Sequence, residues 1–329
     1  MNFLVGDIGG TNTRLLFSKM NGNICDVLYE KSYFSQQFSC LNEVINKFLL
    51  DYDITGSIDA ACFAIAGPVE NGTVSVTNLP WLIKEDELNE ELHTSHVKLI
   101  NDFLAVAIGI SELKENDFVI IQEGQEQVSS DAAIIGAGTG LGAAHLVWSG
   151  NQYHPYTSEA GHTGFAPENA LQSELLIWLQ QQYSHVSLEM LLSGKGLVTI
   201  YEFHHKIIGL NESLQVKEAM KTNDPAQVIT EYALADTDEL CQKTLACFID
   251  IYGAAAGNIA LNYYPIGEIY IAGGIAEKIK DKIISPAFIQ AFVNKGLLSS
   301  NMKKITIKLI TQDKVGLYGA LAMLKSTYL

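Results

Sequence analysis

The chain has 329 residues, of which 48% are hydrophobic, and this predicts a globular protein with two domains or one large domain. Its formal net charge of −16 argues against a nucleic-acid partner, since there is no basic stripe to displace counterions from phosphates. No apolar run reaches the roughly 18 residues that span a membrane, and the first residues lack a secretory pattern, so we expect a cytoplasmic protein with no membrane partner.

The first part of the sequence alternates short apolar runs with turn residues. We expect three strands, a helix and a further strand, over residues 3–7, 13–18, 24–34, 41–49 and 59–65. Gly9-Gly10 falls between the first two strands and therefore belongs to a hairpin. This order is a β-β-β-α-β half-domain.

A second series of elements follows. A short strand over residues 97–100 leads into a helical pattern that starts after Asn101-Asp102. Further strands are expected over residues 118–121, 131–135, 143–148, 152–156, 268–272 and 305–310, a largely helical region from about 170 to 264, and a last helix from about 315 to 324. The two halves repeat an organisation rather than a sequence.

Two glycine-rich turns, at residues 7–12 and 136–142, are each flanked by predicted strands. Glycine lets successive backbone N–H groups converge on an anion, so two such turns predict two related domains that close on one polyphosphate. A tight hairpin without a ligand is the alternative for either turn alone. Asp7 favours a phosphate site, because a carboxylate at a strand end can hold a hydrated magnesium ion against phosphates.

Two common phosphate-binding motifs are excluded. Neither turn has the lysine of G-x-x-x-x-G-K-[ST]. Residues 138–143 fit G-x-G-x-x-[GA], but that fingerprint opens a helix, whereas residues 142–148 have the pattern of a strand.

Several polar residues are candidates for chemistry, and each also has an ordinary structural explanation. Asn101 and Asp102 precede a helix and could simply cap it. Glu159 and His162 have a common spacing, and single residues of these types usually lie on the surface or in a satisfied core. Glu189 fits the third position of a helix cap. Only the order of these residues along the chain points to function.

The five cysteines include no C-x-x-C pair, so the sequence supports neither disulfides nor a thiolate zinc site. We expect reduced thiols. Cys62, Cys241 and Cys247 lie in apolar or helical patterns and are expected to pack in the core.

In their order, the motifs of the chain resemble those of the bacterial glucokinase family. The matching segments are Asp7-Ile8-Gly9-Gly10-Thr11-Asn12, Ile100-Asn101-Asp102-Phe103, Gly136-Ala137-Gly138-Thr139-Gly140-Leu141-Gly142, Glu159-x-x-His162, Ile271-Ala272-Gly273-Gly274-Ile275, Ala66-Gly67-Pro68, Thr77-Asn78-x-x-Trp81 and Phe165-Ala166-Pro167. The resemblance covers almost the whole chain. It implies an α/β protein with the two-domain actin-like ATPase (ribonuclease H-like) fold of hexokinases, actin and Hsp70-type ATPases, with a cleft between the domains.

The resemblance also implies roles for single residues. Asp102 matches the catalytic aspartate that accepts the proton of the sugar 6-hydroxyl, and the residues matching sugar ligands are Asn101, Asp102, Glu159, His162 and Glu189. Those matching the ATP site are Asp7, Gly9, Gly10, Thr11, Asn12, Gly138, Thr139, Gly140, Gly273 and Gly274, with Asp7 holding Mg²⁺ through water. Carboxylates and amides suit the vicinal hydroxyls of a sugar, and phosphoryl transfer needs alignment and stabilised oxygens.

A cysteine-rich segment distinguishes two branches of these kinases, and this sequence lacks it. The related repressor, open-reading-frame and kinase family usually adds a cysteine-rich zinc segment after the Glu-x-x-His element. No cysteine lies between His162 and Cys241. We therefore place the chain in the zinc-free branch and interpret His162 as a sugar ligand.

The sequence therefore predicts a hexose kinase, most simply an ATP-dependent glucokinase that produces glucose 6-phosphate. We expect a small domain of residues 1–110 plus 313–329, a large domain of residues 111–312 and, by analogy with the family, a homodimer. The alternatives are a kinase for another hexose or an N-acetylhexosamine, a non-catalytic sugar sensor, and an actin-like or chaperone ATPase. The glycine turns suit ATP and polyphosphate-type donors equally.

Overall fold

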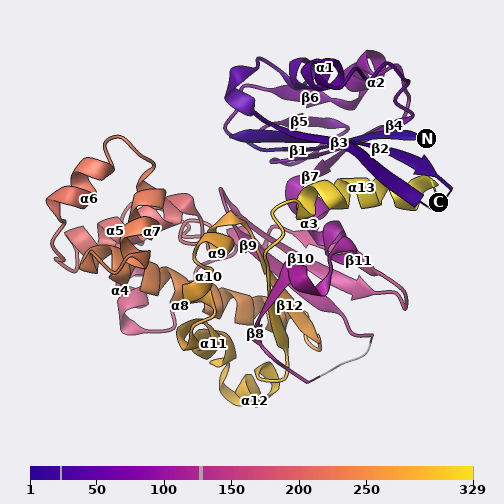
Figure 1. The fold of residues 1–329 in the computed structure, drawn as a ribbon. Helices are drawn as coiled ribbons and strands as arrows, with labels where there is room; N and C mark the ends of the chain where they lie inside the picture. The colour runs from indigo at the N-terminus through magenta and orange to yellow at the C-terminus, as the bar shows by residue number, and fades with distance from the viewer. Residues whose placement is uncertain (23, 126–128, 329) are drawn as a thin grey trace. The chain divides into compact units, whose positions relative to one another are not determined.

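The computed structural model describes residues 1–22, 24–125 and 129–328. The chain divides into two compact units. The first consists of Met1–Lys114, Gln152–Pro155 and Gln312–Leu329, and the second of Glu115–Asn151 and Tyr156–Thr311. Figure 1 shows both units, with labels on the helices and on most of the strands.

The first unit is built on a five-stranded sheet with the order β3-β2-β1-β4-β7. Its strands are β1 (Asn2–Ile8), β2 (Asn12–Asn21), β3 (Ile24–Phe34), β4 (Ala60–Ile65) and β7 (Val97–Asn101). β1, β2 and β3 are antiparallel, whereas β4 and β7 continue the sheet parallel to β1. The expected β-β-β-α-β order is confirmed, with α1 (Leu41–Asp51) between β3 and β4.

The remaining elements of this unit include two that the sequence patterns did not predict, namely α2 and the β5-β6 hairpin. These elements are α2 (Glu85–Glu91), α3 (Asp102–Gly109), α13 (Val315–Tyr328), β5 (Thr73–Ser75), β6 (Leu82–Lys84), η1 (Ser35–Gln37) and η2 (Ile110–Glu112). α13 continues past its expected end near residue 324.

Alternation along β1 builds a core on each face of this sheet, because successive strand residues point to opposite sides. Leu4 belongs to the cluster that includes Phe48 of α1. Phe3 and Val5 belong to the opposite cluster, which includes Leu317 of α13.

Two glycines let α13 lie directly against α3. A Cβ on Gly319 would lie 1.8 Å from the carbonyl oxygen of Ala105, and one on Gly109 would lie 2.1 Å from that of Val315. No side chain fits at such distances, so the two helix backbones touch. This contact fixes the C-terminal helix beside the helix that begins with Asp102.

The second unit is built on a six-stranded sheet with the order β11-β10-β9-β12-β13-β8. Its strands are β8 (Phe118–Gln122), β9 (Ala132–Ala137), β10 (Leu141–Trp148), β12 (Glu268–Ala272), β13 (Thr306–Ile310) and β11 (Tyr153–Ser158), of which residues 153–155 are counted with the first unit. β9, β12 and β13 are parallel, and β10 is antiparallel to β9. The expected hairpin around the second glycine turn is therefore confirmed.

The helices of this unit that end by residue 262 confirm the expected helical region from about 170 to 264, whereas those that begin at residue 274 or later were not predicted. The helices are α4 (Ala170–Gln180), α5 (Gly194–Lys206), α6 (Leu214–Ala219), α7 (Pro225–Leu234), α8 (Glu239–Asn262), α9 (Gly274–Lys278), α10 (Lys280–Ile283), α11 (Pro286–Val293) and α12 (Ser299–Met302), with η3 (Glu115–Asp117), η4 (Ala160–His162) and η5 (Gly296–Leu298). By length and composition α8 could cross a membrane, but 78% of its most apolar window is buried inside the structure. Core helices of soluble proteins pass the same test, so this one helix is weak evidence for a membrane span.

The three cysteines expected in the core are buried there. Cys62 lies in β4, and Cys241 and Cys247 lie in α8. Burial raises the pKa of each thiol, which keeps it neutral and unreactive. Their expected packing role is confirmed.

Candidate active site

The first glycine turn joins β1 to β2 and contains four of the predicted phosphate ligands, Gly9, Gly10, Thr11 and Asn12. The Gly9 N–H donates to the carbonyl oxygen of Asn12 at 2.9 Å. A Cβ on Gly10 would lie 3.1 Å from the carbonyl oxygen of Thr77. The turn is therefore tight and packs closely against a neighbouring loop.

A buried serine that the sequence analysis did not identify supports this turn. The Ser35 hydroxyl donates to the carbonyl oxygen of Gly9 at 2.8 Å and lies 3.0 Å from Oγ1 of Thr13. The Ser35 N–H donates to the carbonyl oxygen of Thr11 at 2.9 Å. Ser35 has no exposed surface. Its three contacts fix the backbone of the first glycine turn.

Asn101 and Asp102 lie where β7 ends and α3 begins. Oδ1 of Asn101 accepts hydrogen bonds from the N–H groups of Phe103 and Leu104 at 3.0 and 3.2 Å, so the capping role holds for Asn101. Nδ2 of Asn101 donates to Oδ1 of Asp102 at 3.0 Å. The Phe103 N–H donates to the same Asp102 oxygen at 2.8 Å. The Asp102 carboxylate is thus oriented through its Oδ1 atom.

The carboxyl groups of Asp7 and Asp102 influence each other. Burial, and then the charge of Asp102, raise the pKa of Asp7 to about 6, against the opposing charge of Arg14. Burial also raises the pKa of Asp102, although hydrogen bonds at the helix N-terminus oppose this shift. Arg14 is itself engaged in a 2.7 Å ion pair with Asp313. Two partly desolvated carboxylates are therefore held close enough to repel each other.

This setting suits a divalent cation. Mg²⁺ prefers oxygen ligands and is often held by one or two carboxylates together with substrate phosphates. Gly316, at the start of α13, leaves room beside Asp7, since a Cβ there would lie 3.6 Å from the Asp7 Oδ2 atom. In the described ranges no group of three or more His, Cys, Asp or Glu residues could hold a metal.

The second glycine turn, Gly138, Thr139 and Gly140, joins β9 to β10 in the second unit. The Gly138 N–H donates to the carbonyl oxygen of Gly140 at 2.8 Å, and the Gly138 carbonyl accepts from the Gly194 N–H at 3.0 Å. Gly194 begins α5, so the positive end of that helix lies beside the turn. A Cβ on Gly138 would meet no atom within 4 Å. The turn is open on that side.

Glu189 lies against this hairpin. Its Oε2 atom accepts a hydrogen bond from the Leu141 N–H at 3.0 Å, and its own N–H donates to the Gly161 carbonyl at 2.9 Å. A Cβ on Gly140 would lie 2.6 Å from Oε2 of Glu189, and one on Gly161 would lie 2.2 Å from the Leu141 carbonyl oxygen. Residues 188–192 form bends and turns rather than a helix. The alternative explanation of Glu189 as a helix-cap residue is therefore wrong.

Glu159 directly precedes the short segment η4, and His162 is its last residue. Oε2 of Glu159 and Nε2 of His162 lie 3.8 Å apart, and these side chains are 88% and 60% exposed. Because Gly161 contacts both Leu141 and Glu189, this segment lies beside the second glycine turn. The structure thus groups the predicted sugar ligands of the second unit.

The Gly273-Gly274 motif follows β12, the parallel neighbour of β9. Gly273 has a φ of +90°, and a Cβ on it would lie 2.3 Å from the carbonyl oxygen of Ala137. Gly274 begins α9, and a Cβ there would meet no atom within 4 Å. The two nucleotide motifs predicted for this half of the chain are therefore adjacent.

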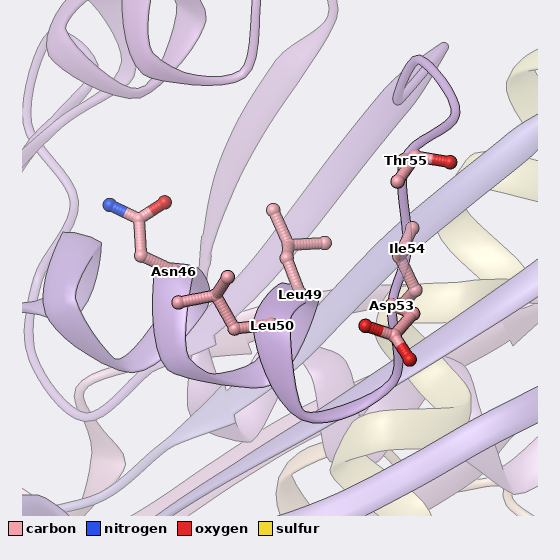
Figure 2. A pocket seen from close by; sticks show the side chains of 6 residues that line it. All are labelled: Asn46, Leu49, Leu50, Asp53, Ile54 and Thr55. Carbon is pink, nitrogen blue, oxygen red and sulfur yellow. The ribbon is translucent and has the colours of Figure 1, made fainter.

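A pocket of about 310 Å³ lies elsewhere in the first unit. Figure 2 shows its walls, which come from α1 and the loop after it: Asn46, Leu49, Leu50, Asp53, Ile54 and Thr55. It contains none of the predicted site residues, and its lining is mainly hydrocarbon.

An α/β chain of two units with two glycine hairpins and an oriented aspartate has the features of an actin-like sugar kinase. The family model described as Glucokinase matches residues 4–327. The chain is 41% identical over 331 residues to the glucokinase of Trichormus variabilis, covering 96% of this chain and 97% of that protein. The chain belongs to the glucokinase family.

Solved structures agree with this assignment. The crystal structure of a glucokinase from an Antarctic psychrotroph is 33% identical, with a TM-score of 0.82 over 99% of each chain. The glucokinase of Balamuthia mandrillaris, solved in complex with glucose, is 19% identical, with a TM-score of 0.77 over 97% of this chain and 92% of that one. The second likeness shows the fold alone.

Proposed function

We propose that Asp102 is the general base of the glucokinase reaction of this chain. The family assignment shows the activity, in which the γ-phosphoryl group of ATP is transferred to glucose. The observation that supports the base is the orientation of the Asp102 carboxylate, whose Oδ1 atom is held by Asn101 and by the N–H of Phe103. Its raised pKa favours a group that takes up a proton.

In the proposed reaction, the 6-hydroxyl of the sugar lies against Oδ2 of Asp102. The hydroxyl oxygen forms the new bond to the γ-phosphorus, the bond from that phosphorus to the β-γ bridging oxygen breaks, and the hydroxyl proton passes to Asp102. The other sugar hydroxyls bind Asn101, Glu159, His162 and Glu189. Phosphoryl transfer depends mainly on alignment and charge stabilisation, which positioned hydrogen bonds can supply.

The two glycine turns and Gly273-Gly274 are proposed to hold ATP. Backbone N–H groups of the turns can donate to phosphate oxygens, and the N-terminus of α5 adds a favourable dipole. Asp7 is proposed to hold Mg²⁺ through water. When bound, Mg²⁺ would neutralise charge on the β- and γ-phosphates.

The proposal includes the cleft that the fold family implies. Asn101 and Asp102 belong to the first unit, whereas Glu159, His162 and Glu189 belong to the second. One sugar can bind all of them only if both units contribute to one site. Closure around the sugar would exclude water, which otherwise competes for the γ-phosphoryl group.

The test is the Asp102→Asn variant, which keeps the shape of the side chain and removes the base. We expect kcat to fall by about 10² to 10⁴, while the Kd for glucose, measured by calorimetry, stays within about threefold. Asp224→Asn is a matched control, because Asp224 also caps a helix and Asn preserves the cap. Near-normal turnover of Asp102→Asn would show that the base is assigned wrongly.

A coupled ADP-release assay with a panel of sugars tests the substrate. We expect glucose to give the highest kcat/KM among glucose, mannose, fructose and N-acetylated amino sugars. Preference for another sugar would favour the alternative hexose kinases. Glucose binding without ADP release would favour a sugar sensor, and ADP release without any sugar would favour an actin-like ATPase.

A further inference from the structure

A tyrosine hydroxyl in the core of the second unit joins the ends of two strands. Tyr252 lies on α8 and has no exposed surface. The Ala137 N–H donates to its hydroxyl oxygen at 3.2 Å, and the hydroxyl lies 3.2 Å from the carbonyl oxygen of Ala272, to which it can donate. The Ile135 carbonyl is a more distant acceptor at 3.4 Å.

The position of these partners links Tyr252 to the nucleotide motifs. Ala137 ends β9 and directly precedes Gly138, whereas Ala272 ends β12 and directly precedes Gly273. The last pair of facing residues between the parallel strands β9 and β12 also lies here, and it consists of Gly136 and Ala272. One hydroxyl therefore satisfies backbone groups of both strands at the point where they give way to the two glycine motifs.

The ends of β9 and β12 are packed too closely to move far relative to each other. A Cβ on Gly273 would lie 2.3 Å from the carbonyl oxygen of Ala137, so the turn after β12 already touches the end of β9. The Tyr252 ring packs edge-on against Phe248 and Phe288, with centroids 6.0 and 5.8 Å away. Burial raises the pKa of the hydroxyl, which stays a neutral donor at physiological pH.

We infer that Tyr252 is a positioning residue for ATP, because its hydroxyl sets the spacing between the Gly138–Gly140 turn and the Gly273-Gly274 motif. This inference rests on the proposed assignment of both motifs to the nucleotide. Without the hydroxyl, a buried N–H and a buried carbonyl each lose a hydrogen bond, and the loss of such a bond in the core is costly. The strand ends then shift or admit water, and both responses change the spacing that one nucleotide must match.

The test is Tyr252→Phe, which removes one oxygen and keeps the ring between its aromatic neighbours. We expect the Kd for ADP, measured by calorimetry without sugar, and the KM for ATP to rise roughly tenfold. We expect the KM for glucose to change by about twofold or less. A purely structural role would lower Tm and leave the Kd for ADP unchanged, which would overturn the inference.

Tyr201→Phe is the matched control. Tyr201 is also a buried tyrosine of this unit, but its hydroxyl contacts the carboxylate of Glu212, at 3.4 Å, rather than the strand ends before the glycine motifs. The same chemical change there should leave the Kd for ADP unchanged. A similar rise in both variants would mean that loss of any buried hydroxyl loosens the unit, and the inference would be wrong.

Gly138→Ala separates this inference from the proposed function. An added Cβ at Gly138 meets no protein atom within 4 Å, so the variant should fold normally and interfere only with a ligand. If Gly138→Ala weakens ADP binding and Tyr252→Phe does not, the inference fails while the nucleotide assignment stands. If neither variant weakens it, the assignment itself fails.

A measurement on the unaltered protein covers the case in which Tyr252→Phe does not fold. ADP should slow amide hydrogen exchange at residues 135–138 and 271–274 together, because one hydroxyl joins the two segments. Protection of only one segment, or of neither, would contradict the inference.

Discussion

Replacing Asp7 by Asn should stabilise the unliganded protein at neutral pH while removing most of its activity. Burial, followed by the charge of Asp102, raises the pKa of Asp7 from 3.8 to about 6. The folded protein thus holds an ionised carboxylate in an unfavourable place, which asparagine avoids. Activity should fall because the proposed magnesium ligand is lost.

The size of the effect follows from the pKa shift. A shift from 3.8 to about 6 spans about 2 pH units, and at about 1.4 kcal/mol per unit it corresponds to roughly 3 kcal/mol. Since the pKa of Asp7 is higher in the folded state, the folded state binds more protons between these values. In the parent protein, the contribution of Asp7 to the free energy of unfolding is fully present below about pH 4. It is lost as the pH rises to about 6, and it does not change above that value.

The assay is urea unfolding of both proteins without substrates and with EDTA, from pH 4.5 to 7.5. Asp7→Asn should gain roughly 2 kcal/mol relative to the parent protein across this range. Asp51→Asn is a control of opposite sign, because hydrogen bonds from Lys31 and Lys47 hold the pKa of Asp51 well below its usual range. That variant should lose stability by an amount that stays constant across this pH range, because the contribution of Asp51 is lost only below about pH 3.8. An Asp7→Asn protein that is less stable at pH 7.5, or whose advantage does not depend on pH, would refute the reasoning.

Two further pairs of variants test the glycine turns. Gly138→Ala should leave Tm unchanged and raise the KM for ATP. Gly273→Ala should lower the free energy of unfolding by about 2 kcal/mol or more, because Gly273 has a φ of +90° and lies against Ala137. Equal stability of the two variants would contradict this prediction. Ser35→Ala should lower the free energy of unfolding by about 1–3 kcal/mol and raise the KM for ATP, because the Ser35 hydroxyl holds the first glycine turn. Ser18→Ala should not lose stability, since the Ser18 hydroxyl is buried without a hydrogen-bond partner in the described part of the chain. If both variants lost the same stability, the loss in Ser35→Ala would not come from the hydrogen bonds of its hydroxyl.

Local patterns predicted the strands of the two large sheets and the long helices, because their signals lie within a few residues. The strand over residues 24–34 and the hairpin around Gly9 follow from alternation and from glycine, both of which can be read along the chain. The partners of Glu189 and Ser35 could not be read in this way, because their hydrogen bonds join residues 48 and 26 positions apart. Tyr252 was missed for the same reason, since it contacts a backbone group 115 positions away.

Glycine shows most clearly where sequence reasoning ends. The sequence marks Gly138, Gly140, Gly273 and Gly274 alike as phosphate or nucleotide positions, but the structure separates them. A Cβ on Gly273 would clash with backbone atoms of Ala137, so packing alone requires glycine there, whereas a Cβ on Gly140 would meet only the carboxylate end of the flexible Glu189 side chain. Gly138 and Gly274 face open space, and packing does not explain the absence of a side chain. At these two positions the proposed nucleotide would supply the reason for glycine, so they are the glycines whose substitution tests nucleotide binding rather than folding.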